Sequence, residues 1–172
     1  FFKSERPGEF LITGLRLRLP RQPAPVLEYG PLRQLAGQPA TLDTVRYVRE
    51  LVCSLRRAKL PDPAELPNAG SFFKNPVVDA DHHARLRRDW PELVSFAVDG
   101  GYKLAAGWLL ERAGWKGWRR GDLGMHAHQA LVMVNHGAAT GAEVLALAQE
   151  IRADIRNRFG VELEQEPVIL PR

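Results

Sequence analysis

The spacing of apolar and polar residues along the chain predicts both strands and helices. Leucine and arginine alternate in residues 10–19 (FLITGLRLRL), which is the period of a strand with one buried face. In residues 41–58 and 140–159, apolar residues recur every three or four positions, which is the period of a helix with one buried stripe. We therefore predict a strand over the first stretch and a helix over each of the other two.

The ends of the second helix carry the clearest local signals in the sequence. Thr140 and Glu143 have the spacing of a capping box, and Gly160 follows the last apolar position, where glycine is common. Weaker patterns predict an extended piece over 25–29 before the turn Gly30-Pro31, helices over 80–88 and 103–113, and strands over 130–135 and 161–170. Because strands and helices alternate without a strict βαβ order, the predicted fold class is α+β.

The stretch between Lys59 and Pro63 marks a boundary within the chain. It contains two prolines, and proline ends a helix at or before the residue that precedes it. We therefore predict a domain boundary at this stretch.

Composition and charge narrow the class of protein. The chain has 172 residues and a net charge of +4. It lacks a run of about 18 apolar residues, and its first residues lack the pattern of a signal peptide. We therefore expect a soluble, intracellular protein. The only cysteine, Cys53, excludes a disulfide and a cysteine metal site, and we expect its thiol to be buried.

The basic residues do not form a nucleic-acid footprint. The arginine pairs at 56–57, 87–88 and 119–120 lie in different segments, with acidic residues interspersed. Such scattered charges are typical of solvated surfaces.

The sequence also lacks the usual spacings of metal and phosphate sites. Four of the five histidines form two short groups, His82-His83 and His126-Ala-His128, and neither has a third ligand nearby in the sequence. Glycine-rich loops of the phosphate-binding kinds are absent. We therefore predict no metal site.

The stretch NAGSFFKNP (residues 68–76) can be read in two ways from its residues alone. It can be a short buried strand over 72–74 that the neighbouring glycine and proline simply end. It can also hold the Ser71 hydroxyl in a cleft, with the following lysine and asparagine facing an anionic ligand. Composition and periodicity leave this choice open.

Five sequence blocks together resemble the C-terminal half of the UDP-N-acetylenolpyruvoylglucosamine reductases, the MurB family. They come in the family's order and at its spacings, and they are AKLPDP (58–63), NAGSFFKNPVV (68–78), YKLAAGWLLERAGWKG (102–117), HQALVMVN (128–135) and LEQEPVIL (163–170). The resemblance implies a flavoenzyme of cytoplasmic peptidoglycan synthesis. In this family NADPH reduces bound FAD, and the flavin then reduces the enolpyruvyl ether of UDP-GlcNAc to UDP-N-acetylmuramate.

The resemblance assigns the chemistry to two residues. Ser71 matches the family's proton donor, and Glu166 matches its second catalytic residue. Hydride addition to the enolpyruvyl group leaves negative charge that spreads into the neighbouring carboxylate, so the site must stabilise this charge and deliver one proton. Phe72 and Phe73 are expected to fix the serine and to exclude water. By pattern alone Glu166 would be one of several alternating glutamates on a solvent face, and Pro167 departs from the valine that is usual in the family.

Further positions match family residues that hold the substrate or the cofactor. Lys59 and Asn75 match positions that bind the UDP part, and a lysine charge with an amide donor suits a diphosphate. Tyr29 matches the tyrosine of a mobile loop that closes over the nucleotide in one type of this family. The remaining candidates are Gln129 and Lys116 for the substrate and Arg56 for the flavin.

The resemblance also predicts the roles of the domains. Residues 1–60 would be the C-terminal remainder of an FAD-binding α+β domain, and 61–160 the substrate-binding C-terminal domain. Residues 161–172 would return the catalytic glutamate to the flavin side. The family's N-terminal part supplies most of the FAD cradle and a catalytic arginine and would precede residue 1. This chain alone is therefore expected to be inactive.

Two alternatives to an enzyme remain open at this point. A non-catalytic sugar-nucleotide-binding module would use Lys59, Asn75 and Tyr29 but would need neither Ser71 nor Glu166. A nucleic-acid-binding domain would bind DNA with a steep salt dependence. From the resemblance, we expect the enolpyruvyl UDP-sugar as the partner, and neither nucleic acid nor a membrane.

Overall fold

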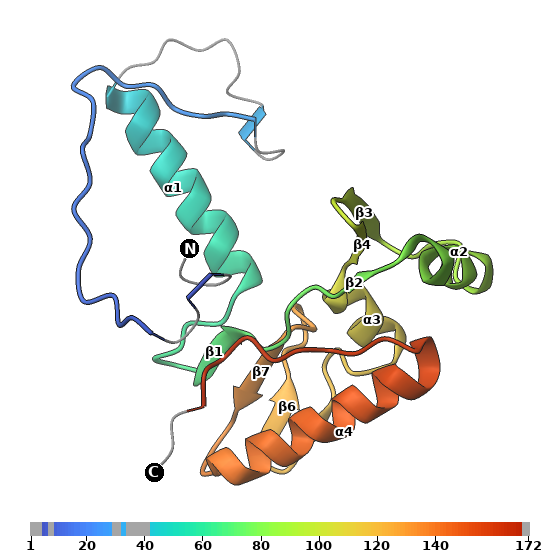
Figure 1. Cartoon of the computed structure of the whole chain (residues 1–172). Coiled ribbons are helices and arrows are strands. Elements are labelled where there is room, and N and C mark those ends of the chain that lie inside the picture. Colours follow the sequence, from blue (N-terminus) through green and yellow to red (C-terminus); the bar gives the residue numbers. More distant parts are fainter. Residues whose placement is uncertain (1–4, 7–8, 29–31, 34–41, 170–172) are drawn as a thin grey trace. The chain divides into compact units, whose positions relative to one another are not determined.

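The computed structural model of the chain describes residues 5–6, 9–28, 32–33 and 42–169 (Figure 1). The chain divides into two compact units, Phe1–Cys53 and Ser54–Arg172, and each is described by itself. Helices and antiparallel strands both occur, which confirms the predicted α+β class. Among the residues described, no helix combines the length and the apolar character that a membrane span requires.

The strand predicted over 10–19 is wrong. These residues form no ladder, and their leucines are exposed, with Leu11 at 88% and Leu15 at 81%. An alternating pattern becomes a strand only where a neighbouring strand completes its hydrogen bonds. The described residues of the first unit provide no such neighbour.

Helix α1 (Leu42–Lys59) starts in the first unit and confirms the helix predicted over 41–58. Its Cys53 is a free thiol that is only half-buried, so the prediction of a buried cysteine is wrong. The reason is that α1 is half-buried at this level, where Val52 and Leu55 also remain partly accessible. The extended piece predicted over 25–29 has no ladder in its described residues.

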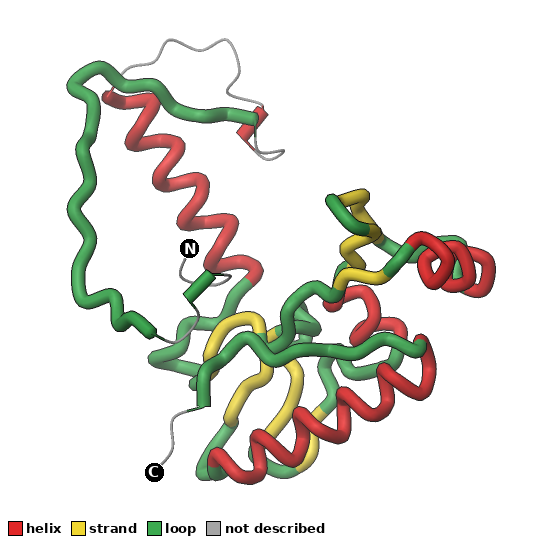
Figure 2. Tube along the Cα trace, viewed as in Figure 1, coloured by secondary structure: helices red, strands yellow, loops and turns green. Residues whose placement is uncertain are grey.

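Two small antiparallel sheets form the frame of the second unit (Figure 2). The first has the strand order β1-β7-β6-β5, with bounds Asn68–Ser71, Val132–Asn135, Leu123–Met125 and Arg119–Arg120. The second has the order β2-β4-β3, with bounds Val77–Val78, Gly101–Leu104 and Ser95–Val98. The helices that follow α1 are α2 (Ala80–Asp89), α3 (Ala106–Arg112) and α4 (Gly141–Phe159).

Both ends of α4 form as the sequence predicts. The Thr140 amide donates to Glu143 Oε2 at 2.7 Å, and the Glu143 amide donates to Thr140 Oγ1 at 3.3 Å, which completes the capping box. These hydrogen bonds to Thr140 lower the pKa of the Glu143 carboxyl group. Gly160 closes the helix with a φ of 65°, a left-handed conformation that favours glycine.

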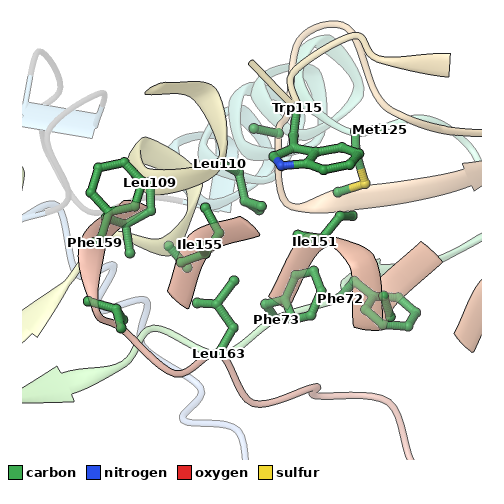
Figure 3. Packing of buried hydrophobic residues seen from close by; sticks show 14 of the residues in the cluster. Phe72, Phe73, Leu109, Leu110, Trp115, Met125, Ile151, Ile155, Phe159 and Leu163 are labelled. Carbon is green, nitrogen blue, oxygen red and sulfur yellow. The ribbon is translucent and has the colours of Figure 1, made fainter. Parts of the chain in front are cut away.

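The core of the second unit joins α3, α4 and the first sheet to the segment that follows α4 (Figure 3). Ile151 and Ile155 of α4 are fully buried, and Phe73 and Leu163 are each only 1% exposed. Burial of a large apolar side chain stabilises a fold by about 1.5–3 kcal/mol. Phe73 and Leu163 therefore anchor two segments that are distant in the sequence.

The helix predicted over 103–113 begins later than expected. Lys103 lies in β4, where Val77 pairs with it from one side and Phe96 from the other. The helix itself starts only at Ala106. Pairing with strands elsewhere in the chain therefore overrides the local helical pattern.

Of the other predictions for the second unit, two are confirmed and one is wrong. Helix α2 confirms the helix predicted over 80–88, and β7 confirms the strand predicted over 130–135, with a later start. The strand predicted over 161–170 is wrong for its described residues, since only one bridge forms there, between Phe73 and Gln165. Pro167 has no amide hydrogen with which to continue a ladder.

Candidate active site

Ser71 lies at the end of β1, on a strand that is locally irregular. Ser71 pairs with Val132 and Asn68 pairs with Val134, so the register shifts between these two pairs. Gly70 has a φ of 73°, and its amide donates to Asn68 Oδ1 at 2.9 Å. A register shift of this kind is typical of a β-bulge, which changes the direction in which the neighbouring side chains point. Ser71 is exposed at this point.

The residues that follow Ser71 are anchored in the core. Phe72 and Phe73 are 6% and 1% exposed, and their rings meet edge to face with centroids 5.2 Å apart. The Phe72 amide donates to the Leu131 carbonyl at 2.8 Å. The short strand that was one of the two readings of this stretch does not form over 72–74, because the ladder of β1 ends at Ser71 and only Phe73 makes a further bridge. The motif thus combines an exposed serine with a buried aromatic pair.

Glu166 lies next to this serine, although it comes from the far end of the unit. The Lys74 amide donates to the Glu164 carbonyl at 2.8 Å, and the Glu166 amide donates to the Phe72 carbonyl at 2.9 Å. In Figure 1 the segment after α4 accordingly runs back past β1. Glu166 is therefore fixed opposite Phe72, the neighbour of Ser71.

The three alternating glutamates of this segment have different surroundings. Arg156 pairs with Glu162 at 2.8 Å, and its guanidinium lowers the pKa of that carboxyl group. Lys74 pairs with Glu164, and both side chains are exposed. Two of the glutamates thus form exposed ion pairs, and Glu166 is the one beside Ser71.

Asn75 and Gln129 both lie near the beginning of α3. The Ala106 amide donates to Asn75 Oδ1 at 2.9 Å, so the amide nitrogen of Asn75 remains as its donor group. A methyl group placed on Gly107 would come within 4.0 Å of Gln129 Oε1. The Asn75 side chain caps a helix that its own N-cap residue, Ala105, does not cap.

The other residues that were predicted to bind the substrate lie in different parts of the chain. The Lys116 ammonium pairs with Glu111 at 2.8 Å, and a methyl group placed on the next residue, Gly117, would come within 3.7 Å of the Ala127 Cα. No described contact joins Lys59 to Ser71 or Asn75. Tyr29 lies outside the described residues.

A cavity of about 660 Å³ opens beside Gly70, between the end of α1 and the start of β1. Arg56 lines it, as does Arg57. Sequence reasoning missed Arg57, because a pair of adjacent arginines looks like an ordinary solvated surface. The signal that was available is the position of this pair just before the Lys59 block. Asp62 and Glu65 line the same cavity, so its wall carries both positive and negative side chains.

The side chains of His82 and His83 have partners within the protein. A ring nitrogen of His82 is 3.0 Å from the Phe159 carbonyl, and one of His83 is 2.8 Å from Ser95 Oγ. The His83 ring also stacks on Tyr102. Within the described ranges, no group of three or more histidine, cysteine or acidic side chains could hold a metal ion.

Comparison with known proteins gives consistent matches. The family model described as "UDP-N-acetylenolpyruvoylglucosamine reductase, C-terminal domain" matches residues 62–170. The Pseudomonas aeruginosa protein named UDP-N-acetylenolpyruvoylglucosamine reductase is 56% identical to this chain over 96% of its residues. The Alcanivorax borkumensis protein of the same name is 52% identical over 99% of this chain. The Bordetella pertussis protein of the same name is 50% identical over 99% of this chain.

The chain spans about half the length of the curated relatives that it matches, 49% of each of these three. A crystal structure titled as this reductase from Thermus caldophilus aligns with 72% of the chain and 34% of its own, at 24% identity and a TM-score of 0.42. That likeness is too low to carry an argument. On the sequence matches, the chain belongs to the UDP-N-acetylenolpyruvoylglucosamine reductase family and contains that family's C-terminal domain.

Proposed function

We propose that this chain is the substrate-binding half of an NADPH-dependent flavoenzyme that reduces UDP-N-acetylenolpyruvoylglucosamine to UDP-N-acetylmuramate. The reaction would belong to the cytoplasmic synthesis of peptidoglycan precursors. Membership of the family supports this proposal. The single observation that carries it is the hydrogen bond between the Glu166 amide and the Phe72 carbonyl, because it brings the two candidate catalytic residues together.

The arrangement suits the second half of the reaction. Bound FAD, once reduced by NADPH, would supply a hydride to the enolpyruvyl group. Negative charge then spreads into the substrate carboxylate, and Ser71 donates its hydroxyl proton to the adjacent carbon. Glu166 is assigned as the second acid–base group. The buried Phe72 and Phe73 rings hold the serine from behind and exclude water on that side.

The flavin would be held mainly by residues outside this chain. In the family resemblance, most of the cradle precedes residue 1. Within the chain, Arg56 is assigned to the flavin from the resemblance, and its neighbour Arg57 lines the same cavity beside Gly70. The remaining candidates, Lys59, Asn75, Gln129, Lys116 and Tyr29, are assigned to the UDP-sugar.

Asn75→Asp is expected to raise KM for the UDP-sugar about tenfold, with little change in kcat. Aspartate keeps the acceptor for the Ala106 amide, but it replaces the amide donor by a charge that repels a diphosphate. Asn75→Ala should also lower the free energy of unfolding by about 1 kcal/mol, because α3 loses its cap.

Steady-state kinetics together with thermal unfolding separate these two effects. The matched control is Thr140→Ala, which removes the cap of α4. It should be destabilised by a similar amount with KM unchanged. An unchanged KM in Asn75→Asp would remove Asn75 from the substrate site.

A comparison of two polypeptides tests the function as a whole. Residues 1–172 alone, purified with excess FAD, should be colourless and inactive, because a flavin needs a walled slot and donors for its pyrophosphate. A longer protein that adds the family's N-terminal half should retain the flavin band. It should also consume NADPH only when the enolpyruvyl substrate is present, with UDP-N-acetylmuramate as the product.

Two results would contradict the proposal, one for the place of the flavin site and one for the enzymatic activity. A stoichiometric flavin band on residues 1–172 would show that the cradle lies in this chain. UDP-GlcNAc binding by the longer protein without NADPH consumption would favour the sugar-nucleotide-binding module instead.

A further inference from the structure

The loop that carries Gln129 joins β6 to β7 and is closed by hydrogen bonds at His126. The His126 amide donates to the Val132 carbonyl at 2.8 Å, and the Gln129 amide donates to the His126 carbonyl at 3.3 Å. The Val132 amide in turn donates to the Gln129 carbonyl at 3.0 Å. Val132 is also the residue that pairs with Ser71. The loop is therefore built directly on the strand beside the candidate catalytic serine.

The imidazole of His126 takes part in this network. Its Nδ1 accepts the amide hydrogen of His128 at 3.4 Å. A nitrogen that accepts a hydrogen bond carries no proton, so this contact requires the neutral ring with its hydrogen on Nε2. The His128 ring meets the His126 ring edge to face, with centroids 5.7 Å apart. The side chain and the backbone of His126 thus hold the same turn.

The surroundings of His126 favour the neutral ring. Partial burial is the main cause that lowers its pKa, and the nearby His128 and His136 lower it further. Gly117 lies near the residue after His126, since a methyl group placed on Gly117 would come within 3.7 Å of the Ala127 Cα. Its neighbour Lys116 is already paired with Glu111. The charged groups that act on His126 are therefore the two histidines, His128 and His136.

We infer that His126 is a positioning residue for substrate binding, because its unprotonated Nδ1 holds the 126–129 turn in the shape that presents Gln129. The inference rests on the proposed function, since it assumes that Gln129 binds the UDP-sugar. When His126 takes up a proton, Nδ1 becomes a donor that faces the amide hydrogen of His128, and the turn loses this hydrogen bond.

The sign of the pH effect follows from the lowered pKa. The ring is neutral at pH 7, so KM should be constant above neutral pH. As pH falls through the pKa of His126, the acceptor is lost and KM should rise. One neutral hydrogen bond corresponds to about a threefold to tenfold change in KM. The value of kcat should follow the same pH dependence with or without His126, because the residue touches no reacting atom.

The experiment measures KM for the enolpyruvyl UDP-sugar with the complete reductase, from about pH 8 to about pH 5.5. His126→Asn places an amide oxygen near the position of Nδ1 and cannot take up a proton in this range. It should show no additional rise in KM at low pH. His126→Ala lacks the acceptor and should show the raised KM at every pH. The control His136→Gln should keep the low-pH rise, with its midpoint at slightly higher pH, since one repelling charge is gone.

A spectroscopic measurement keeps this inference separate from the proposed function. In the wild type, the ¹H–¹⁵N signal of the His128 amide should titrate together with the His126 ring, whether or not the protein reduces the substrate. His126→Asn should abolish that titration. The inference is overturned if the His128 amide titrates unchanged in His126→Asn, or if His126→Asn keeps the rise in KM. Absence of any reductase activity at pH 8 would contradict the proposed function instead.

Discussion

Ser71→Ala in the complete reductase should leave flavin reduction by NADPH near its normal rate, and should slow reduction of the enolpyruvyl substrate about 100-fold to 10,000-fold. The first half-reaction requires no acid at this position. The second half-reaction loses a positioned general acid, and this loss typically has the stated size. The change should not disturb the fold, because the side chain of Ser71 is exposed and β1 pairs with β7 through backbone groups.

Stopped-flow absorbance resolves the two half-reactions of this variant. Ser71→Thr is the matched control, because it keeps a hydroxyl group at the same backbone position. It should retain more of the second half-reaction than alanine does. If alanine slowed both half-reactions equally, Ser71 would be a structural residue and not the proton donor.

Glu166→Gln should lower kcat about 100-fold or more while KM changes little. The amide keeps the shape of the side chain but removes its charge and its ability to exchange a proton. The hydrogen bond to Phe72 uses the backbone amide of residue 166, so the segment should stay in place. A fall in kcat with an unchanged free energy of unfolding would then report on the carboxylate.

The neighbouring glutamates provide controls within the same segment. Glu162→Gln and Glu164→Gln each weaken an exposed ion pair, with Arg156 and Lys74 respectively. Exposed pairs contribute about 0–1 kcal/mol to stability, so both variants should keep a normal kcat. A similar fall in kcat in all three variants would mean that the segment acts only as a support. A change in KM alone in Glu166→Gln would remove this residue from the catalytic pair.

The elements that could be predicted from sequence are those whose signals are local. Helix α4 has its capping box and its closing glycine within its own residues, and α1 and α2 have the required period. The strand expected over 10–19 and the helix start expected at Lys103 failed for the opposite reason. A strand depends on partners elsewhere in the chain. The local pattern therefore shows neither that residues 10–19 lack a partner nor that Lys103 pairs within β4.

The candidate site shows the same division. The resemblance to the family pointed to Ser71 and Glu166, whereas periodicity alone would have left Glu166 on a solvent face. The cap that Asn75 provides for α3 and the pairing of Lys74 with Glu164 could not be predicted. Their partners lie 31 and 90 positions away in the sequence, and only the folded backbone brings them together.

The bridge between Phe73 and Gln165 sets an order of events during synthesis on the ribosome. Phe73 leaves the exit tunnel long before Leu163 and Gln165 are made, so one flank of its ring stays uncovered while the intervening residues are added. At typical elongation rates this wait lasts about 5–20 s. During this period the exposed apolar surface of the nascent unit can associate with other chains. The later residues around Gln165 both cover that surface and complete the site.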